Sequence, residues 1–495
     1  MKLRPYQQEV ARAVVDSVQK HKGLTFSVEI ARQGGKNELS AHLEVLLLTL
    51  YMAQGGNLIK CSPTFKPQTV ISMQRLKERL DDFGFDGIYH TEMGYIIVLG
   101  GARQIFLSAE PAASVVGHTA DVLLEIDESQ DVSKEKYTKE FRPMGSASNA
   151  TTVHFGTTWD DSTLLEEIKQ TNLDLERKDG IKRHFRYDWQ EVAKYNPEYR
   201  QFVEAEKGRL GGNHPLFRTQ YALLPISGSG VFLSRQQIAL LLGSHQRLSQ
   251  PHTCPERSEG TQCYIAGIDL AGEREVVSPD SQVMRLKTTD YRLPTHSQDS
   301  TVITIAACSE QHIACNDYHL DATNYPLVRV MEQYQWTGIP HPQLYPQMVD
   351  ILKRWNCRRI VVDATGIGQP VASFLRAQLG SKVKPFTFTQ KSKSDMGFEL
   401  LSFINSGRLK LYKQDGSQEY RETMFELEKA KVQYRPNQMV NFYVDPSEGH
   451  DDFLMSLALL VIGARDFRPR QAKGLFQKMY CWGLSAPHGL GGDKP

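Results

Sequence analysis

The sequence has few cysteines and no pattern that would pair them or use them to hold a metal ion. Its 495 residues include seven cysteines, an odd number without any Cys-x-x-Cys pair. A disulfide framework favours an even set at regular spacings, and a zinc site favours closely spaced thiols. We therefore expect reduced thiols and neither a disulfide-stapled scaffold nor a zinc site.

Long hydrophobic runs are also lacking. The longest apolar segment, residues 41–53, contains Glu44 and is shorter than the roughly 18–20 residues needed to cross a bilayer. The amino-terminal segment shows no uninterrupted apolar core and no small-residue cleavage site, so neither secretion nor lipidation is indicated. We expect a cytosolic protein with no membrane partner.

A large excess of either sign of charge is lacking as well, since the chain has 58 basic and 57 acidic residues. A chain that is basic throughout is excluded, but local patches that hold phosphate are not. At about 100–200 residues per domain, the length predicts about two to four globular domains, each large enough to bury a core.

Both halves of the chain alternate short β-branched strands with helical patterns, which predicts α/β layering in each half. Between them, the Gly/Ser stretch 227–230 predicts a flexible joint, and a short amphipathic helix follows it. The division we predict is a first domain at 1–226, a linker at 227–262, a second domain at 263–465 and a basic, mobile tail at 466–495.

The first half contains a phosphate-loop pattern. The segment LTFSVEIARQGGKN, residues 24–37, runs from an alternating strand into two glycines and a lysine, and an apolar helix follows. Backbone N–H groups at a helix start can surround phosphate oxygens, and Lys36 can neutralise them. Ile30 replaces the usual first glycine, and Asn37 stands where a hydroxyl would contact Mg²⁺. Taken alone, the pattern fits a glycine turn with a surface lysine equally well.

Two further strands of the first half end in polar residues. The segment DVLLEIDESQD, residues 121–131, presents Asp127 and Glu128 at its end. We expect Asp127 to hold Mg²⁺ through water and Glu128 to orient and deprotonate the water that attacks a γ-phosphate. The strand 151–155 ends in Gly156-Thr157-Thr158, whose hydroxyls suit a sensor of that phosphate. Plain turns are the alternative in both places.

The second half places carboxylates at the ends of predicted elements. Asp269 ends one strand, and Asp363 ends an apolar strand. Asp451 and Asp452 open an apolar helix, and Asp299 is an alternative candidate for the same site. Phosphodiester hydrolysis by two metal ions needs such hard oxygen ligands. For Asp452, a helix cap is an equally good interpretation.

Together these features resemble the large terminase subunit, the motor that packages the DNA of tailed phages. In the first half the resemblance rests on the ARQGGKN loop, the block FLSAEPAASVVGHTADVLLEIDE and the Gly-Thr-Thr triplet. In the second half it rests on the segments GIDLAG, VVDATGIG and HDD. It covers nearly the whole chain, residues 3 to about 464, in the order ATPase then nuclease.

The resemblance implies an α/β fold with an N-terminal P-loop (RecA/helicase-like) ATPase domain and a C-terminal RNase H-like α/β nuclease domain. Glu128 would be the catalytic base, and Arg142 a trans-acting arginine finger or a surface arginine, with Arg103 a weaker competitor. Asp269, Asp363 and Asp451 would be catalytic metal ligands supported by Asp452. The implied ATP-binding residues are Gln7, as adenine reader beside Tyr6, and Arg32, Gln33, Gly34, Gly35, Lys36, Asn37, Asp127 and Thr157.

The implied cofactors are Mg²⁺ with ATP in the first half and two Mg²⁺ or Mn²⁺ ions in the second. The implied partners are double-stranded DNA, the portal protein, the small terminase subunit and further copies of the chain in a ring, in the host cytoplasm rather than the virion. The polar segment 273–298 is either a DNA-contacting loop or a solvated insertion, and the tail is a hypothetical portal contact.

Two alternatives compete with this interpretation. A helicase-like repair or restriction ATPase-nuclease would need a second RecA-like half, and no second phosphate-loop pattern follows Thr158. A DNA-binding structural protein of the virion would not need Lys36, the acidic pair or the carboxylate set.

Overall fold

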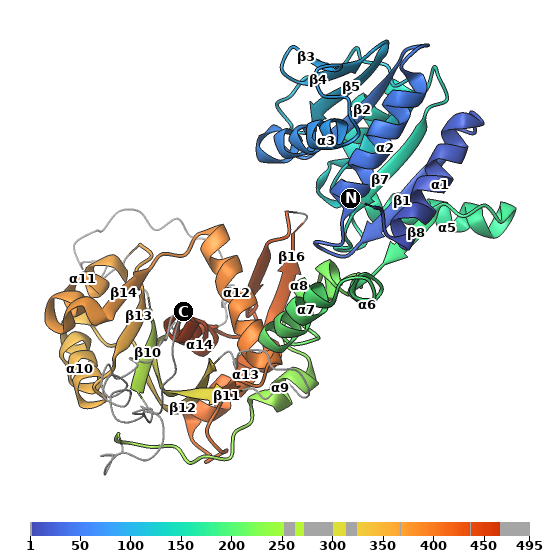
Figure 1. Cartoon of the computed structure of the whole chain (residues 1–495). Helices are drawn as coiled ribbons and strands as arrows, with labels where there is room; N and C mark the ends of the chain where they lie inside the picture. The colour runs from blue at the N-terminus through green and yellow to red at the C-terminus, as the bar shows by residue number, and fades with distance from the viewer. Residues whose placement is uncertain are drawn as a thin grey trace, which may run out of the picture.

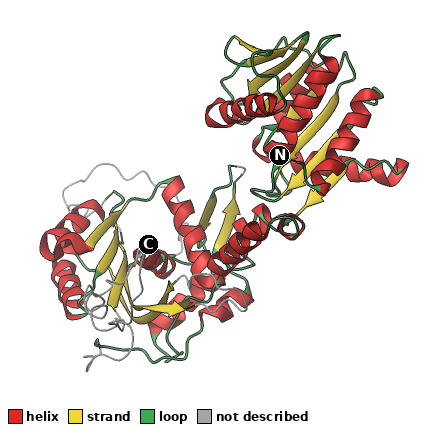
Figure 2. Ribbon diagram, in the orientation of Figure 1, coloured by secondary structure: helices red, strands yellow, loops and turns green. Residues whose placement is uncertain are grey.

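The computed structural model describes residues 2–251, 263–271, 300–312, 324–366, 368–435 and 437–465. Asp299, the whole polar segment 273–298, the last part of the predicted linker and the tail therefore lie outside the described residues. Within the described ranges, no helix combines the length and the apolar character needed to cross a membrane. The described chain forms two large sheets with flanking helices and one small sheet near the joint (Figures 1 and 2).

The first domain is built on a sheet of eight strands in the order β3-β4-β5-β2-β6-β7-β1-β8. Its strands are β1 (Thr25–Ile30), β2 (Gly56–Ser62), β3 (His90–Glu92), β4 (Ile96–Leu99), β5 (Ala102–Ser108), β6 (Leu123–Ile126), β7 (Thr151–Gly156) and β8 (His184–Tyr187). Its longer helices are α1 (Pro5–Gln19), α2 (Lys36–Tyr51), α3 (Val70–Asp82), α5 (Leu164–Asp179) and α7 (Pro197–Leu210). Shorter helices are α4 (Lys134–Lys136), α6 (Trp189–Ala193) and α8 (Pro215–Gln220).

Strand order in this sheet determines where the polar strand ends lie. Strand β7 lies between β1 and β6, and all three run parallel. These strands are almost wholly buried, including polar residues such as Glu29, Glu125 and His154. Because parallel strands end at the same edge of a sheet, the phosphate loop, the acidic pair and the Gly-Thr-Thr triplet meet at one edge.

The second domain is built on a sheet of six strands in the order β14-β13-β10-β11-β12-β15. Strands β10, β11 and β12 are antiparallel neighbours, whereas β10, β13 and β14 are parallel. The strands are β10 (Cys263–Asp269), β11 (Ser300–His312), β12 (Asn324–Thr337), β13 (Arg359–Asp363), β14 (Val383–Phe386) and β15 (Leu409–Lys410). The helices are α10 (His341–Arg354), α11 (Gly368–Leu379), α12 (Gln390–Asn405), α13 (Gln418–Lys429) and α14 (Asp452–Arg465).

Helix α14 is the centre of the second core and is buried along residues 452–464. It packs closely on β10 at Gly267, where a Cβ atom would collide with the backbone of Ser456 and Leu460. Only glycine permits this approach of strand and helix. The end of β10 and the start of α14 are thereby held near each other.

The predicted flexible joint contains a strand. Residues Ser229–Val231 form β9, which pairs with β16 (Lys431–Tyr434), and β16 pairs with β17 (Val440–Tyr443). Backbone hydrogen bonds therefore tie part of the Gly/Ser stretch to the second domain. The short helix predicted after it is α9 (Arg235–Leu241), capped by Ser234 and Gln237.

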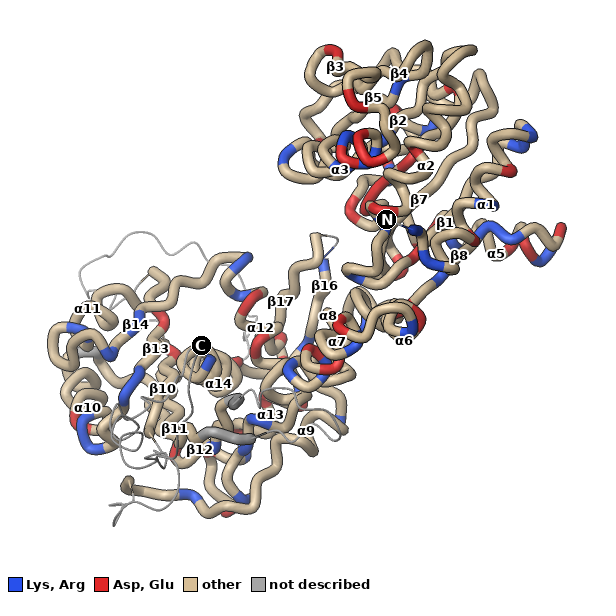
Figure 3. Tube along the Cα trace, in the orientation of Figure 1, with Lys and Arg blue, Asp and Glu red and all other residues tan. Residues whose placement is uncertain are grey.

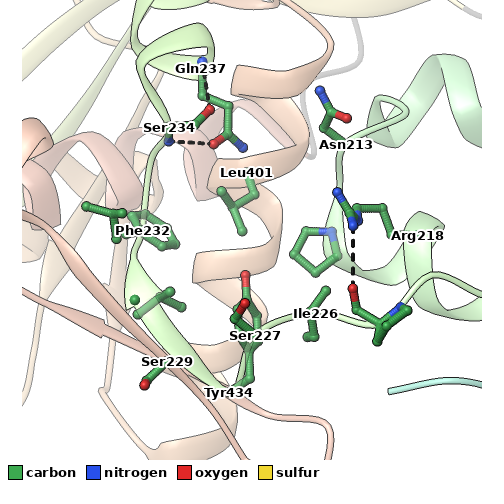
Figure 4. Close-up of a pocket in the computed structure, with 15 residues that line it drawn as sticks. Asn213, Arg218, Ile226, Ser227, Ser229, Phe232, Ser234, Gln237, Leu401 and Tyr434 are labelled. Atoms are coloured by element: carbon green, nitrogen blue, oxygen red, sulfur yellow. Dashed lines mark hydrogen bonds between the residues drawn. The ribbon is translucent and has the colours of Figure 1, made fainter. Parts of the chain in front are cut away.

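A pocket of about 360 Å³ lies beside this joint (Figure 4). It is open on one side and mixes polar with apolar lining residues, among them Arg218, Phe232, Leu401 and Tyr434. Among its lining residues, an Arg218 guanidinium nitrogen lies 3.4 Å from the Pro225 carbonyl oxygen. The lining comes from both predicted domains and from the joint between them.

Helices α7 and α8 connect the first domain to α12 of the second. Ser402 Oγ donates to the Arg209 carbonyl at 2.8 Å, and His214 Nε2 lies 2.9 Å from the Phe398 carbonyl oxygen. Leu216 N–H donates to His214 Nδ1, so the imidazole proton is on Nε2 and is donated to Phe398. Neutral His214 satisfies both contacts, whereas protonation of Nδ1 would break the bond from Leu216.

We predict that His214 makes stability fall on acidification. Burial lowers its pKa from 6.5 to about 4, so below pH 6.5 the unfolded chain binds a proton that the folded chain does not. The free energy of unfolding should fall as the pH drops from 6.5 towards 4, by at most about 1.4 kcal/mol per pH unit for this group. Urea denaturation of His214→Gln should show a shallower slope, and the exposed control His90→Gln the wild-type slope. Equal slopes in all three proteins would contradict the assignment.

Candidate functional sites

The loop between β1 and α2 has its carbonyl groups fixed by side chains. The donors are Tyr199 Oη to Arg32 O at 2.9 Å, Tyr6 Oη to Gly34 O at 2.6 Å and Gln7 Nε2 to Gly35 O at 2.9 Å. In a trans peptide the next N–H group points opposite to the carbonyl. The N–H groups of residues 33, 35 and 36 are therefore turned away from these supports, at the start of a helix where an anion is favoured.

The loop glycines are required by space and by backbone angle. A Cβ atom at Gly34 would lie 2.6 Å from the Ile30 side chain and 2.7 Å from the Ala31 carbonyl oxygen. Gly35 has φ 91° and precedes the first residue of α2, a conformation that other residues rarely adopt. Ile30, which replaces the usual first glycine, is a buried strand residue packed against Gly34.

The predicted adenine reader, Gln7, contacts the loop through its side-chain amide. Gln7 is 4% exposed; its Oε1 accepts from Arg4 N–H while its Nε2 donates to Gly35. Tyr6 is likewise buried, with its hydroxyl on Gly34. Contact of either residue with adenine stays a prediction.

The remaining residues predicted to bind ATP lie around the loop. Arg32 and Gln33 are exposed, and Arg32 Nη1 donates to Gln220 Oε1 at 2.6 Å. Asn37 lies half-buried in the first turn of α2. Their contacts with nucleotide stay predictions.

The acidic pair lies beside the loop lysine. Lys36 Nζ is 3.1 Å from Glu128 Oε1, although 92 residues separate them in sequence. Burial alone would raise the pKa of Glu128, but the Lys36 charge and a hydrogen bond from Gln130 outweigh it, and the pKa is lowered. Glu128 also has φ 44°, a left-handed conformation that is costly outside functional sites. Asp127 is buried beside it, and this burial raises its pKa.

The Gly-Thr-Thr triplet at the end of β7 contacts both neighbouring strand ends. Thr157 N–H donates to Gln130 Oε1 at 3.1 Å, and Thr158 Oγ1 donates to Glu29 Oε1 on β1 at 2.6 Å. Both threonines are buried. The structure thus brings together Lys36, the acidic pair and Thr157, four of the residues selected from sequence.

A buried charge cluster behind this site was missed by sequence reasoning. Lys60 Nζ on β2 lies 2.7 Å from Ser40 Oγ and 3.3 Å from Glu44 Oε1 on α2. Ser40 Oγ in turn donates to Glu125 Oε2 on β6 at 2.5 Å. Burial and the Glu44 charge raise the pKa of Glu125 to about 8, whereas the Lys60 charge opposes this rise. The cluster ties the phosphate-loop helix to the strand that carries Asp127.

We predict that Lys60→Met lowers the free energy of unfolding by about 3–5 kcal/mol, because it leaves two buried carboxyls without their cation. Chemical denaturation measures the loss. Adding Glu44→Gln to Lys60→Met should recover part of it, since one carboxylate is then removed. The exposed control Lys139→Met should stay near wild type. A Lys60→Met protein as stable as wild type would refute the role of the cluster.

The two arginine candidates are both exposed. Arg142 begins a 3-10 turn, Arg142–Gly145, that follows the acidic pair in sequence. Arg103 lies on β5, with Nη2 3.7 Å from Glu92 Oε2. An exposed guanidinium suits either a surface residue or a group that acts on a neighbouring subunit, so the finger role of Arg142 stays a prediction.

In the second domain the predicted carboxylates lie at one edge of the sheet. Strands β10 and β13 are parallel neighbours with Ile268 opposite Val362, so Asp269 and Asp363 follow at the same edge. Asp452 begins α14, and its Oδ2 accepts from Ser300 N–H on β11 at 2.8 Å. Burial raises the pKa of Asp269 well above its ordinary value, and the charges of Asp452, Asp363 and Asp451 raise it further.

The donor set suits a hard divalent cation. Four carboxylates whose negative charges oppose one another would be relieved by Mg²⁺ or Mn²⁺, which prefer oxygen ligands. In the described ranges, however, no three His, Cys, Asp or Glu side chains lie close enough to hold one ion together. The carboxylates converge on a region without forming a closed ligand set.

Two residues near this region, Glu426 and Lys393, lie in segments with no motif that would select them as candidate site residues. Glu426 on α13 accepts from Leu454 N–H at 2.8 Å, and burial together with Asp452 and Asp451 raises its pKa to about 9. Lys393 on α12 has its pKa lowered by burial, against the opposing charges of Asp451 and Asp269. Nothing in their own segments resembles a motif; only the fold places them here.

Basic and acidic residues are interspersed along the described parts of both domains (Figure 3). This mixture is what the near-equal totals of the two charge types lead us to expect. Contacts with an anionic partner would therefore depend on local groups of basic residues, or on single ones such as Lys36.

Comparison with known proteins agrees with this architecture. Residues 296–462 match the family described as the Terminase RNaseH-like domain. The large terminase of a thermophilic bacteriophage has a TM-score of 0.51 at 12% identity, covering 93% of this chain and 98% of that one. The HK97 bacteriophage large terminase has a TM-score of 0.38 at 14% identity, covering 93% and 95%. No curated protein matches the chain in sequence.

The fold thus defines a two-domain α/β protein whose second domain contains the match to the Terminase RNaseH-like family. The likeness to the terminase of the thermophilic phage, at 12% identity, establishes the fold, and the family match covers residues 296–462 of the second domain. Both findings agree with the resemblance to the large terminase subunit drawn from the sequence motifs.

Proposed function

We propose that the chain is the ATP-driven motor and nuclease of a phage DNA-packaging machine. ATP hydrolysis in the first domain moves double-stranded DNA into a procapsid, and the second domain cuts concatemeric DNA into genome lengths. The observation that carries the proposal is the contact of Lys36 with Glu128 in a chain that also gathers Asp269, Asp363 and Asp452 at a second sheet edge. A portal protein, a small terminase subunit and a ring of copies are its proposed partners in the host cytoplasm.

In the proposed ATPase cycle, the backbone N–H groups of Gly35 and Lys36 bind the phosphates. Hydrogen bonds to the carbonyl groups of Gly34 and Gly35 orient these N–H groups away from the supporting side chains. Lys36 exchanges its contact with Glu128 for the β- and γ-phosphate oxygens. Glu128, ionised because its pKa is lowered, then accepts the proton of the attacking water. Asp127 would hold Mg²⁺ through water, and that ion neutralises phosphate charge when bound.

In the proposed nuclease, Asp269, Asp363 and Asp451 would hold two Mg²⁺ or Mn²⁺ ions, supported by Asp452. When bound, such ions activate a water and stabilise the leaving oxygen of the phosphodiester. The chain's own contribution is positional. Ser300 N–H holds Asp452 at 2.8 Å, and Thr365 N–H holds Asp363 Oδ1 at 2.8 Å.

We predict that Lys36→Ala reduces DNA-stimulated ATP turnover by at least about 100-fold, because the phosphates lose their cation. Metal-dependent nicking of plasmid should persist, since Lys36 belongs to the first domain. The exposed control Lys22→Ala should behave as wild type in both assays. ATP turnover retained by Lys36→Ala would disprove the loop assignment.

The reciprocal prediction concerns Asp363→Ala, which should lower plasmid cleavage about 100-fold or more and spare ATP turnover. Asp395→Ala, on the surface of α12, is the matched control. If Asp363→Ala linearised plasmid as wild type does, the carboxylate cluster would not be the nuclease centre.

The rival helicase-like enzyme finds no support in the described ranges. A second RecA-like half would require another parallel sheet with a phosphate loop, whereas β10, β11 and β12 are antiparallel neighbours. A packaging assay with procapsids and double-stranded DNA separates the two, because a repair enzyme would hydrolyse ATP without filling capsids.

A further inference from the structure

The β16–β17 hairpin of the second domain reaches the ATPase edge of the first (Figure 1). Trp159 Nε1, one residue beyond the Gly-Thr-Thr triplet, donates to the Arg435 carbonyl at 3.0 Å. The Trp159 ring packs edge-on against Tyr434, with ring centres 6.1 Å apart. At the hairpin tip, Gln438 Nε2 donates to Asp131 Oδ1 at 2.9 Å. The hairpin thus contacts segments that follow both Glu128 and Thr157.

On the first-domain side of this contact, one buried amide joins the two segments. Gln130 Nε2 donates to Glu128 Oε2 at 2.8 Å, and Gln130 Oε1 accepts from Thr157 N–H at 3.1 Å. A Cβ atom at Gly156 would overlap the Gln130 amide, so the glycine of the triplet leaves room for it. The amide donates to the carboxylate through its nitrogen and accepts from the N–H group through its oxygen, so it serves both at the same time.

The Gln130 amide is also shared with the residue that the hairpin contacts. Its Nε2 lies 3.3 Å from Asp131 Oδ2, a longer contact than the one to Glu128. The amide nitrogen carries two hydrogens and can donate to both carboxylates, so its position is a compromise between Asp131 and Glu128. Gln438 supplies Asp131 with a donor of its own, which leaves the shorter bond of Gln130 with Glu128.

We propose that Gln130 is a positioning residue for ATP hydrolysis, and that docking of Gln438 on Asp131 strengthens its hold on Glu128. The proposal rests on the ATPase function proposed above. In it, the nuclease-domain hairpin raises the rate of the chemical step by orienting the base, without contributing to nucleotide affinity. The hairpin is then an intramolecular activator of the motor.

Steady-state ATP turnover of the full chain tests the positioning role. Gln130→Leu should lower kcat about 10-fold, the loss expected for one hydrogen bond to a charged group, with KM for ATP within about twofold of wild type. Gln130→Glu should also lower kcat, because a carboxylate cannot donate to Glu128 and repels it. Wild-type kcat in both variants, or a loss confined to KM, would overturn the positioning role.

The hairpin contact is tested by Gln438→Ala, which should lower kcat about threefold, and by its neighbour Asn437→Ala, which should not. Adding Asp131→Asn to Gln438→Ala should restore the rate, because the competing acceptor is weakened. Equal rates for both alanine variants, or no recovery in the double variant, would overturn the docking role. If the docking role were overturned while Lys36→Ala was inactive, the ATPase proposal would still stand. ATP turnover that survives Lys36→Ala would refute both the ATPase proposal and the positioning proposal.

Discussion

The placement of β7 between β1 and β6 is the constraint on which the first site depends. Three parallel strands end at one edge, so residues far apart in sequence meet there: Lys36 lies 3.1 Å from Glu128, and Thr157 is joined to Glu128 through Gln130. Behind this edge, the buried charge cluster centred on Lys60 holds the loop helix against the acidic strand. The backbone of the loop is oriented by side chains before any ligand arrives.

The second domain uses the same geometric device with different chemistry. Parallel β10 and β13 bring Asp269 and Asp363 to one edge, and the close packing of α14 on Gly267 adds Asp451 and Asp452. Two centres that both depend on carboxylates account for part of the near-neutral charge of the chain. Modest charge also suits the proposed motor, because a protein that binds phosphate strongly everywhere would release DNA slowly.

Local patterns predict much of this arrangement. The strands ending at Asp269 and Asp363, the helix starting at Asp452 and the strand before the acidic pair all follow from the sequence, because apolar periodicity and polar strand ends are local properties. The partners of side chains are not predictable in this way. Lys60 and Glu44 meet only after α2 packs on the sheet, and Gln438 reaches Asp131 across 307 residues.

Local reasoning is also incomplete where a tertiary contact decides the role of a residue. The motif around Gln7 predicts an adenine contact, which stays a prediction, and the structure adds contacts of the Gln7 amide with Arg4 and Gly35. The Gly/Ser stretch predicts a flexible joint, yet it contains β9, paired with β16. In both cases the contact that defines the role of the segment comes from an element remote in sequence.

The central claim is that one chain holds two separate centres, one for ATP and one for divalent metal ions. The most direct test is a crystal structure with a non-hydrolysable ATP analogue and Mn²⁺, using anomalous scattering to locate the metal. The account predicts phosphates on the N–H groups of Gly35 and Lys36, and manganese both near Asp127 and among Asp269, Asp363 and Asp451. Nucleotide bound away from Lys36, or no manganese among the second set of carboxylates, would contradict it.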